Sequence, residues 1–203
     1  MEKLRIALWI AVSVALFALG AISVSGFSFL GKEGATAALK PGAPLGGPFQ
    51  LVNTTGSPVT EAIFREKPSV TFFGYTHCPD VCPTALTDFG KWIQELGPDA
   101  DKLRFIFVTV DPERDSPEVV REYINAFSDK IVGISGPPAA VHAMVKDYKI
   151  YSRKAPGEGS EDYLMDHTGS MVLQDAQGNF VGTIDNAESR EAGLAKLRRL
   201  VAG

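Results

Sequence analysis

The chain contains two cysteines, Cys78 and Cys82, and only three residues separate them. They lie in residues 74–83 (GYTHCPDVCP), directly after an apolar, aromatic stretch and directly before a stretch with helical periodicity. Two thiols at this spacing can form a reversible disulfide, attack a disulfide in another molecule, or hold a soft metal ion. The chemistry of the protein therefore depends on which of these reactions the rest of the chain supports.

Pro83 indicates where the following helix begins, because proline is tolerated in a helix only within the first turn. We expect Cys82 as the N-cap, Pro83 as the first helical residue, and Cys78 in the turn just ahead. Both sulfurs would then face the unpaired N–H groups of the helix start, whose field favours thiolate over thiol. Thiolates bind metals and attack disulfides, so this location suits both roles and disfavours a pair of unreactive buried cysteines.

Strands and helices alternate along the chain around the cysteine pair. Stretches rich in β-branched and aromatic residues predict buried strands at 69–75 and 103–110, and a short strand is expected at 130–135. Helices are expected at 83–96, from 117 onward, at 138–148 and at 187–201, with hairpins around 53–57 and 175–178. This order predicts an α/β fold whose central sheet is covered by helices on both faces. A strand, a cysteine pair and a helix, followed by a terminal hairpin and helix, favour a thioredoxin-like domain.

Three histidines could supply a further metal ligand. His77 adjoins Cys78, and neighbouring side chains of an extended segment point in opposite directions, so we expect His77 at the rim of the loop. His142 lies within a predicted helix, far from other donors, and is expected to be an ordinary helix residue. His167 stands at the entrance to a hairpin strand that faces the cysteine loop in thioredoxin-like domains. Its spacing alone leaves a structural role and a ligand role equally open.

Acidic residues adjoin the predicted site from two segments. Asp111 and Asp115 follow a buried strand, at the sheet edge where the cysteine loop also emerges. Turn and helix-cap chemistry alone could explain them. As residues that support metal ligands, Asp111 is favoured over Asp115, which could pair with Arg114, and Asp166 is expected to orient the neighbouring His167 ring. The polar segment 152–162 is expected to be a mobile loop that orders when His167 binds metal.

Three motifs occur in order along the chain: GYTHCPDVCP at 74–83, TVDPERD at 109–115 and YLMDHTGS at 163–170. Together they resemble the Sco/SenC family of copper-binding proteins of cytochrome oxidase assembly, over about 49–200. The resemblance implies a thioredoxin-like fold, and it implies that Cys78, Cys82 and His167 bind one copper ion. The chain matches the family at all three positions.

The resemblance further implies that the protein helps to build the binuclear copper centre of an oxidase subunit. It could deliver copper, keep the cysteines of that centre reduced, or do both. The expected partners are the copper-centre domain of the oxidase subunit and another copper chaperone or a thiol reductant. The ligand chemistry agrees, because thiolates suit Cu(I) and an added imidazole lets a site accept Cu(II). Zinc normally takes four ligands, or three and a water.

The main alternative is a membrane-tethered thiol-disulfide reductase that acts on the cysteines of the oxidase copper site without an essential metal. In that enzyme Cys78 and Cys82 would be the redox-active pair: Cys78 would attack the substrate disulfide, and Cys82 would resolve the mixed disulfide. Loss of function on replacing His167 would favour copper over this alternative. A thiol peroxidase is disfavoured because Thr76 lies too close to the cysteine, and a redox or copper sensor at the same site stays open.

The N-terminal segment predicts a membrane anchor. The run from Ile6 to Leu30 has no charged residue and, at about 1.5 Å per residue, is long enough to cross a bilayer. It exceeds the apolar core of a cleaved signal peptide, about 7–15 residues, so we expect an uncleaved single-pass helix over 1–30. Lys3 and Arg5 precede it, which favours a bacterial inner-membrane protein with its domain in the periplasm.

The remaining chain divides into a linker and one domain. Residues 31–48 are rich in Gly, Ala and Pro and predict a flexible linker, which leaves 49–203 as the copper-binding domain. The net charge is −4, and no cluster of Lys and Arg occurs. This balance argues against nucleic acid as a partner.

Overall fold

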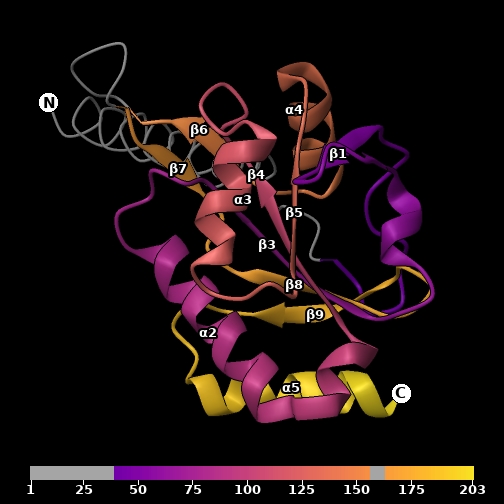
Figure 1. Ribbon diagram of the computed structural model, residues 1–203. Coiled ribbons are helices and arrows are strands. Elements are labelled where there is room, and N and C mark those ends of the chain that lie inside the picture. The colour runs from indigo at the N-terminus through magenta and orange to yellow at the C-terminus, as the bar shows by residue number, and fades with distance from the viewer. Residues whose placement is uncertain (1–38, 156–162) are drawn as a thin grey trace, which may run out of the picture. The chain divides into compact units, whose positions relative to one another are not determined.

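The computed structural model describes residues 39–155 and 163–203. Within them, seven strands form one sheet in the order β2-β1-β5-β4-β3-β8-β9 (Figure 1). The three central strands are β3 (Ser69–Gly74), β4 (Arg104–Thr109) and β5 (Ile131–Ser135), and they run parallel. The outer strands are antiparallel to their neighbours: β1 (Leu51–Asn53), β2 (Pro58–Val59), β8 (Met171–Gln174) and β9 (Phe180–Ile184). The strands expected at 69–75, 103–110 and 130–135 are therefore confirmed.

Helices cover both faces of this sheet, as expected for an α/β fold. The helices are α2 (Val81–Leu96), α3 (Pro117–Asn125), α4 (Pro138–Asp147) and α5 (Arg190–Ala202), with 3-10 turns η1 (Glu61–Phe64) and η2 (Gly97–Lys102). On one face, Phe89 of α2 packs on Phe105 of β4, with ring centroids 5.3 Å apart. On the other face, Tyr148 after α4 packs on Phe73 of β3 at 5.5 Å.

The helix α2 presents the cysteines to the edge of the sheet. Its predicted apolar face is buried, and it consists of Ala85, Leu86, Phe89, Trp92, Ile93 and Leu96. The start of the helix differs from our expectation, because Asp80 is the N-cap and the helix begins at Val81. Pro83 is compatible with this start, since none of the N–H groups in the first turn has a partner within the helix. Cys82 therefore lies inside the first turn.

A second sheet of two strands stands apart from the main sheet, at the upper left of Figure 1. It pairs β6 (Ser152–Lys154) with β7 (Met165–His167), and we call it the ribbon. The expectation of a mobile loop was wrong for residues 152–154, which form β6, while 156–162 lie outside the described residues. His167 ends a strand of its own, and the hairpin strand β8 begins at Met171.

The folded unit begins earlier than the boundary expected at residue 49. The backbone of Gly42 donates to the carbonyl of Phe180 in β9 at 2.7 Å, and the N–H of Phe180 donates to the carbonyl of Ala43 at 2.8 Å. Leu45 is buried. The expected anchor at 1–30 and the linker up to residue 38 lie outside the described residues. In the part of the chain that the structure describes, no helix has the length and apolarity to span a membrane.

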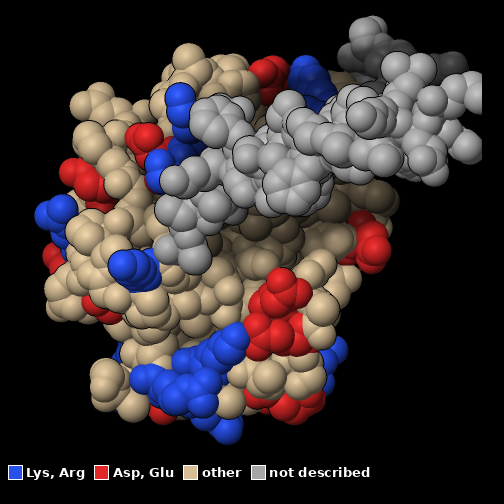
Figure 2. Space-filling view, turned by 180° about the vertical axis from the view of Figure 1, so that it is seen from behind, with Lys and Arg blue, Asp and Glu red and all other residues tan. Residues whose placement is uncertain are grey.

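Charged contacts tie α5 to the edge of the sheet. Figure 2 shows basic side chains gathered beside acidic ones at the lower end of the molecule, where α5 lies in Figure 1. Lys196 of α5 donates to Glu188 at 2.6 Å and to the carbonyl of Thr183 in β9 at 2.8 Å. The indole N–H of Trp92 donates to the carbonyl of Arg190 at 2.9 Å, which joins α2 to α5.

We predict that Gly193→Ala destabilises the fold. A Cβ at this position in α5 would lie 2.4 Å from Cζ2 of Trp92, whose ring is held by its hydrogen bond. Overpacking costs about 1–3 kcal/mol, which outweighs the gain of about 1 kcal/mol in helix propensity. Denaturant unfolding should therefore show a loss of about 1 kcal/mol. Gly182→Ala is the control, since its Cβ would meet nothing within 4 Å; an equal loss in both variants would contradict the argument.

Candidate metal centre

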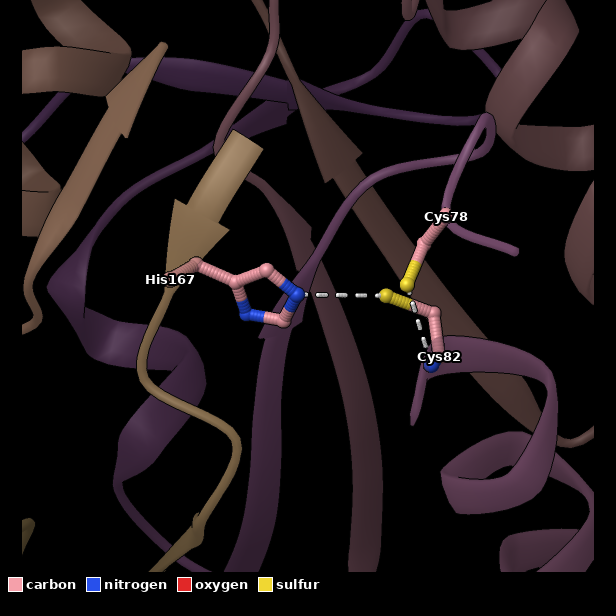
Figure 3. A group of neighbouring side chains, drawn as sticks. All are labelled: Cys78, Cys82 and His167. Atoms are coloured by element: carbon pink, nitrogen blue, oxygen red, sulfur yellow. Dashed lines mark hydrogen bonds between the residues drawn. The ribbon is translucent and has the colours of Figure 1, made fainter. Parts of the chain in front are cut away.

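Two cysteines and one histidine converge at one end of the main sheet. Cys78 lies in the turn before α2, Cys82 in the first turn of that helix, and His167 at the end of β7 (Figure 3). Their ligand atoms all lie within 4.8 Å of one another. Among the described residues this is the one group of three or more Cys, His, Asp or Glu side chains with such a geometry. The structure therefore brings together the three residues that the sequence singled out as ligands.

Local backbone geometry places the two sulfurs next to each other. The N–H of Cys78 donates to the carbonyl of Tyr75 at 3.3 Å, which closes the turn after β3. The N–H of Cys82 donates to Sγ of Cys78 at 3.4 Å. Gly74 leaves room for the second sulfur, because a Cβ at this position would lie only 2.8 Å from Sγ of Cys82. Cys82 is thereby buried behind Cys78, which is partly exposed.

The two thiols differ in their tendency to ionise. The hydrogen bond from the Cys82 side chain lowers the pKa of Cys78 well below that of a free cysteine, and the N–H groups of Asp80 and Cys82 act in the same direction. The same hydrogen bond to Cys78, together with burial, raises the pKa of Cys82. The reduced pair therefore carries one thiolate near neutral pH, and it resides at the exposed Cys78. The expectation of a thiolate at the helix start is met by Cys78 alone.

The ring of His167 is oriented by its surroundings. Its Nδ1 lies 3.0 Å from the carbonyl oxygen of Thr168, and because a carbonyl can only accept, Nδ1 carries the proton. The lone pair is then on Nε2, which lies 3.5 Å from Sγ of Cys82. The rings of Phe72 and Tyr75 contact the imidazole edge-on, at centroid distances of 6.0 and 5.6 Å. The metal-binding nitrogen of His167 is thus aimed at the sulfurs.

The donor set fits a soft or borderline metal ion. Bonds of about 2.0–2.3 Å in a trigonal arrangement separate three ligands by about 3.7–4.0 Å. The three donors need only small displacements from their present separations of at most 4.8 Å to reach such positions. Two sulfurs and an imidazole nitrogen suit copper in particular.

The other two histidines lie where the sequence predicted. The side chain of His77 is about half exposed at the rim of the loop, and its Nδ1 lies 3.0 Å from Oγ1 of Thr76. His142 is a residue of α4, and its Nε2 lies 3.9 Å from Glu113. Neither histidine belongs to the three-ligand group.

Asp111 and Asp115 have different partners in the structure. Arg114 donates to Asp111 at 2.6 Å, so the expected pairing with Asp115 was wrong. Asp115 is fully buried and supports the cysteine loop, because it accepts hydrogen bonds from both the N–H and the hydroxyl of Thr76, at 3.0 and 2.6 Å. Thr109 donates to it as well, at 2.7 Å. Burial raises the pKa of Asp115, although these hydrogen bonds oppose the shift.

Asp166 does not orient the imidazole of His167, contrary to our expectation. Adjacent side chains of a strand point to opposite faces, and Asp166 turns to the exposed face of the ribbon, where Arg153 donates to it at 3.1 Å. The carbonyl of Thr168 performs the expected function instead. A backbone carbonyl leaves no signal in the sequence, so this contact could not be inferred from residue types.

Comparison with known proteins places these features in a family. The family model described as SCO1/SenC matches residues 37–202. The protein SCO2, mitochondrial, of Saccharomyces cerevisiae is 37% identical over 159 residues, which are 77% of this chain and 53% of the yeast protein. The protein SenC of Rhodobacter capsulatus is 35% identical over 150 residues, which are 73% of this chain and 67% of SenC.

A solved structure agrees in fold. The structure of Bradyrhizobium japonicum ScoI with copper bound is 42% identical, and the match covers 77% of this chain and 99% of that chain with a TM-score of 0.71. The chain spans about half the length of the curated yeast relative. The match of the SCO1/SenC model to most of the sequence, together with these relatives, shows that the chain belongs to the SCO1/SenC family.

Proposed function

We propose that the protein is a copper-binding metallochaperone that helps to assemble the binuclear copper centre of cytochrome c oxidase. It binds one copper ion through Cys78, Cys82 and His167. The observation that carries this proposal is the convergence of their three ligand atoms within 4.8 Å. The copper held by the ScoI relative supports it, as does the family resemblance of the motifs around these residues.

The chain supplies ligands for both common oxidation states of copper. The Cys78 thiolate is already charged and partly exposed, so it is the first ligand that an incoming ion meets. Cys82 has to lose its proton when it binds a metal, because thiolates rather than thiols are ligands. Soft sulfur favours Cu(I), and the Nε2 of His167 adds the borderline ligand that Cu(II) requires. Three protein ligands leave a position at which the ligands of an acceptor can enter.

The setting of this chemistry follows from the N-terminal sequence. A single-pass anchor over 1–30 would hold the domain on the periplasmic side of a bacterial inner membrane; this is supported by the uncharged run at 6–30 and by Lys3 and Arg5 ahead of it. From there the domain would reach the copper-centre domain of an oxidase subunit. Its further partners would be another copper chaperone or a thiol reductant.

A second candidate function is the reduction of a disulfide in the oxidase copper site. Both cysteines are free, and Cys78 is partly exposed whereas Cys82 is buried. In this reaction the Cys78 thiolate attacks one sulfur of the substrate disulfide and releases the other as a thiolate. Cys82 then attacks Cys78, so the substrate leaves as a dithiol and the pair becomes a disulfide.

We predict that the reduced domain binds one Cu(II) per chain and that His167→Ala removes the nitrogen ligand. The check is a copper titration with electron paramagnetic resonance, in which nitrogen hyperfine structure should be present in the wild type and absent from the variant. His77→Ala is the matched control, since its ring lies at the rim of the same loop and outside the ligand group. Wild-type protein that binds no copper but still cycles against a disulfide would support the reductase instead.

We further predict that alkylation of metal-free protein separates the two thiols. Because a thiolate persists above its lowered pKa, Cys78 should react with iodoacetamide at rates that stay within about twofold from pH 6 to pH 8. The alkylation rate of a free cysteine, whose pKa is near 8.5, falls about tenfold for each unit by which the pH is lowered over much of this range. In Cys78→Ser, Cys82 should remain unreactive until higher pH. In Cys82→Ala, the alkylation rate of Cys78 should depend on pH as steeply as that of an ordinary thiol. Mass spectrometry of the modified peptides provides the rates.

A further inference from the structure

The position of His167 depends on a ribbon that the main sheet does not hold. The ribbon has three residue pairs, with His167 opposite Ser152 at one end and Met165 opposite Lys154 at the other. It forms a separate sheet, and within residues 39–155 and 163–203 no ladder of backbone hydrogen bonds joins it to the main sheet. An isolated two-stranded ribbon is marginally stable in water. Side-chain contacts must therefore fix where β7, and with it the imidazole of His167, lies.

One set of such contacts converges on Tyr163, two residues before β7. Its hydroxyl donates to Oδ1 of Asp111 at 2.5 Å, and this carboxylate is fully buried. Arg114 donates to Oδ2 of the same carboxylate at 2.6 Å, and its guanidinium lies 3.7 Å from the centre of the Tyr163 ring. The ammonium of Lys154, in the partner strand β6, lies 4.1 Å from the same centre. Hydrogen bonds to a buried carboxylate and cation–π contacts are among the stronger polar interactions in proteins.

These contacts extend toward the metal ligand. The guanidinium of Arg114 also lies 5.9 Å from the centre of the Tyr75 ring, and Tyr75 packs edge-on against the imidazole of His167 at 5.6 Å. Arg114 therefore lies against two aromatic rings, one ahead of β7 and one beside its last residue. Through these two rings, the turn after β4 supports both the start and the end of β7.

The cysteines have a different support. Their loop is held by Asp115 through Thr76, and Cys82 is further fixed by its place in α2. A change at Tyr163 can thus move the histidine ligand while the sulfurs stay in place. We propose that Tyr163 is a positioning residue for His167: it anchors the ribbon to Asp111 and Arg114 and so controls the nitrogen ligand of the metal site. This inference rests on the proposed function and adds a residue that sets how well the site holds Cu(II).

The test compares Tyr163→Phe with Tyr151→Phe. Tyr151 directly precedes β6 on the same ribbon and is 54% exposed, so its variant is a matched control for the loss of one hydroxyl. Tyr163→Phe should weaken Cu(II) binding about tenfold, the effect of one charge-assisted hydrogen bond, and should alter the nitrogen hyperfine pattern. The alkylation rate of Cys78 should stay at its wild-type value, and Tyr151→Phe should match wild type throughout.

A double-mutant cycle distinguishes positioning from a general loss of stability. In a His167→Ala background, Tyr163→Phe should have no further effect on Cu(II) affinity, because the ligand through which it acts is gone. A tenfold loss that persists in this background would overturn the proposal, as would an unchanged Cu(II) affinity and spectrum in Tyr163→Phe itself.

A metal-free measurement separates this inference from the proposed function. The ring resonances of His167 in the reduced, copper-free protein should shift or broaden in Tyr163→Phe and stay unchanged in Tyr151→Phe. If wild-type protein binds no copper, the proposed function fails, but the resonances still report whether Tyr163 positions the ring. Identical His167 resonances in wild type and Tyr163→Phe would refute the inference whatever the copper result.

Discussion

The hydrogen bonds that Cys82 makes to the sulfur of Cys78 govern the chemistry of the whole site. They stabilise a charge on Cys78, and the burial of Cys82 keeps the second thiol neutral. The thiolate of the partly exposed Cys78 can bind a cation or attack a disulfide, and the protonated sulfur of Cys82 lies buried behind it. The first turn of α2 creates this asymmetry because it buries one residue of the pair and leaves the other in the preceding turn. The packing of α2 on the sheet is thus a condition for reactivity.

A single turn after β4 supports the two halves of the site through different carboxylates. Asp115 holds the cysteine loop through Thr76, whereas Asp111 contacts Tyr163 ahead of the strand that carries His167. Both carboxylates are fully buried, and each is satisfied by hydrogen bonds, as buried charges must be. The same turn therefore supports the sulfur ligands and the nitrogen ligand, but it does so through separate sets of hydrogen bonds.

Residue types and spacing predicted the reactive cysteine pair, the central strands and the apolar face of α2, because each leaves a local signal. The ligand role of His167 was left open by its spacing and was implied only by the family resemblance. Residue types could not assign the two carboxylates of the turn, because the spacing of Asp111 and Asp115 does not say which side chain faces the cysteine loop and which faces Arg114. The ribbon was also missed, because strands of three polar residues such as 152–154 carry no usable periodicity. The helix start was placed late, since Pro83 is tolerated at more than one position of a first turn.

Copper binding and disulfide chemistry compete for the same two sulfurs. A disulfide requires the sulfurs to approach to about 2.05 Å, and its formation gives two electrons to an oxidant and leaves neither sulfur as a thiolate. A bound metal in turn needs both as thiolates, at separations close to those already present. Each state thus excludes the other, and oxidation of the pair removes copper affinity by mass action. The proposed chaperone and reductase activities therefore could not operate on one site at the same time, and the supply of reductant would determine how much of the protein could hold copper. His167 lies outside the disulfide, so its imidazole contributes only to the reduced, metal-binding form.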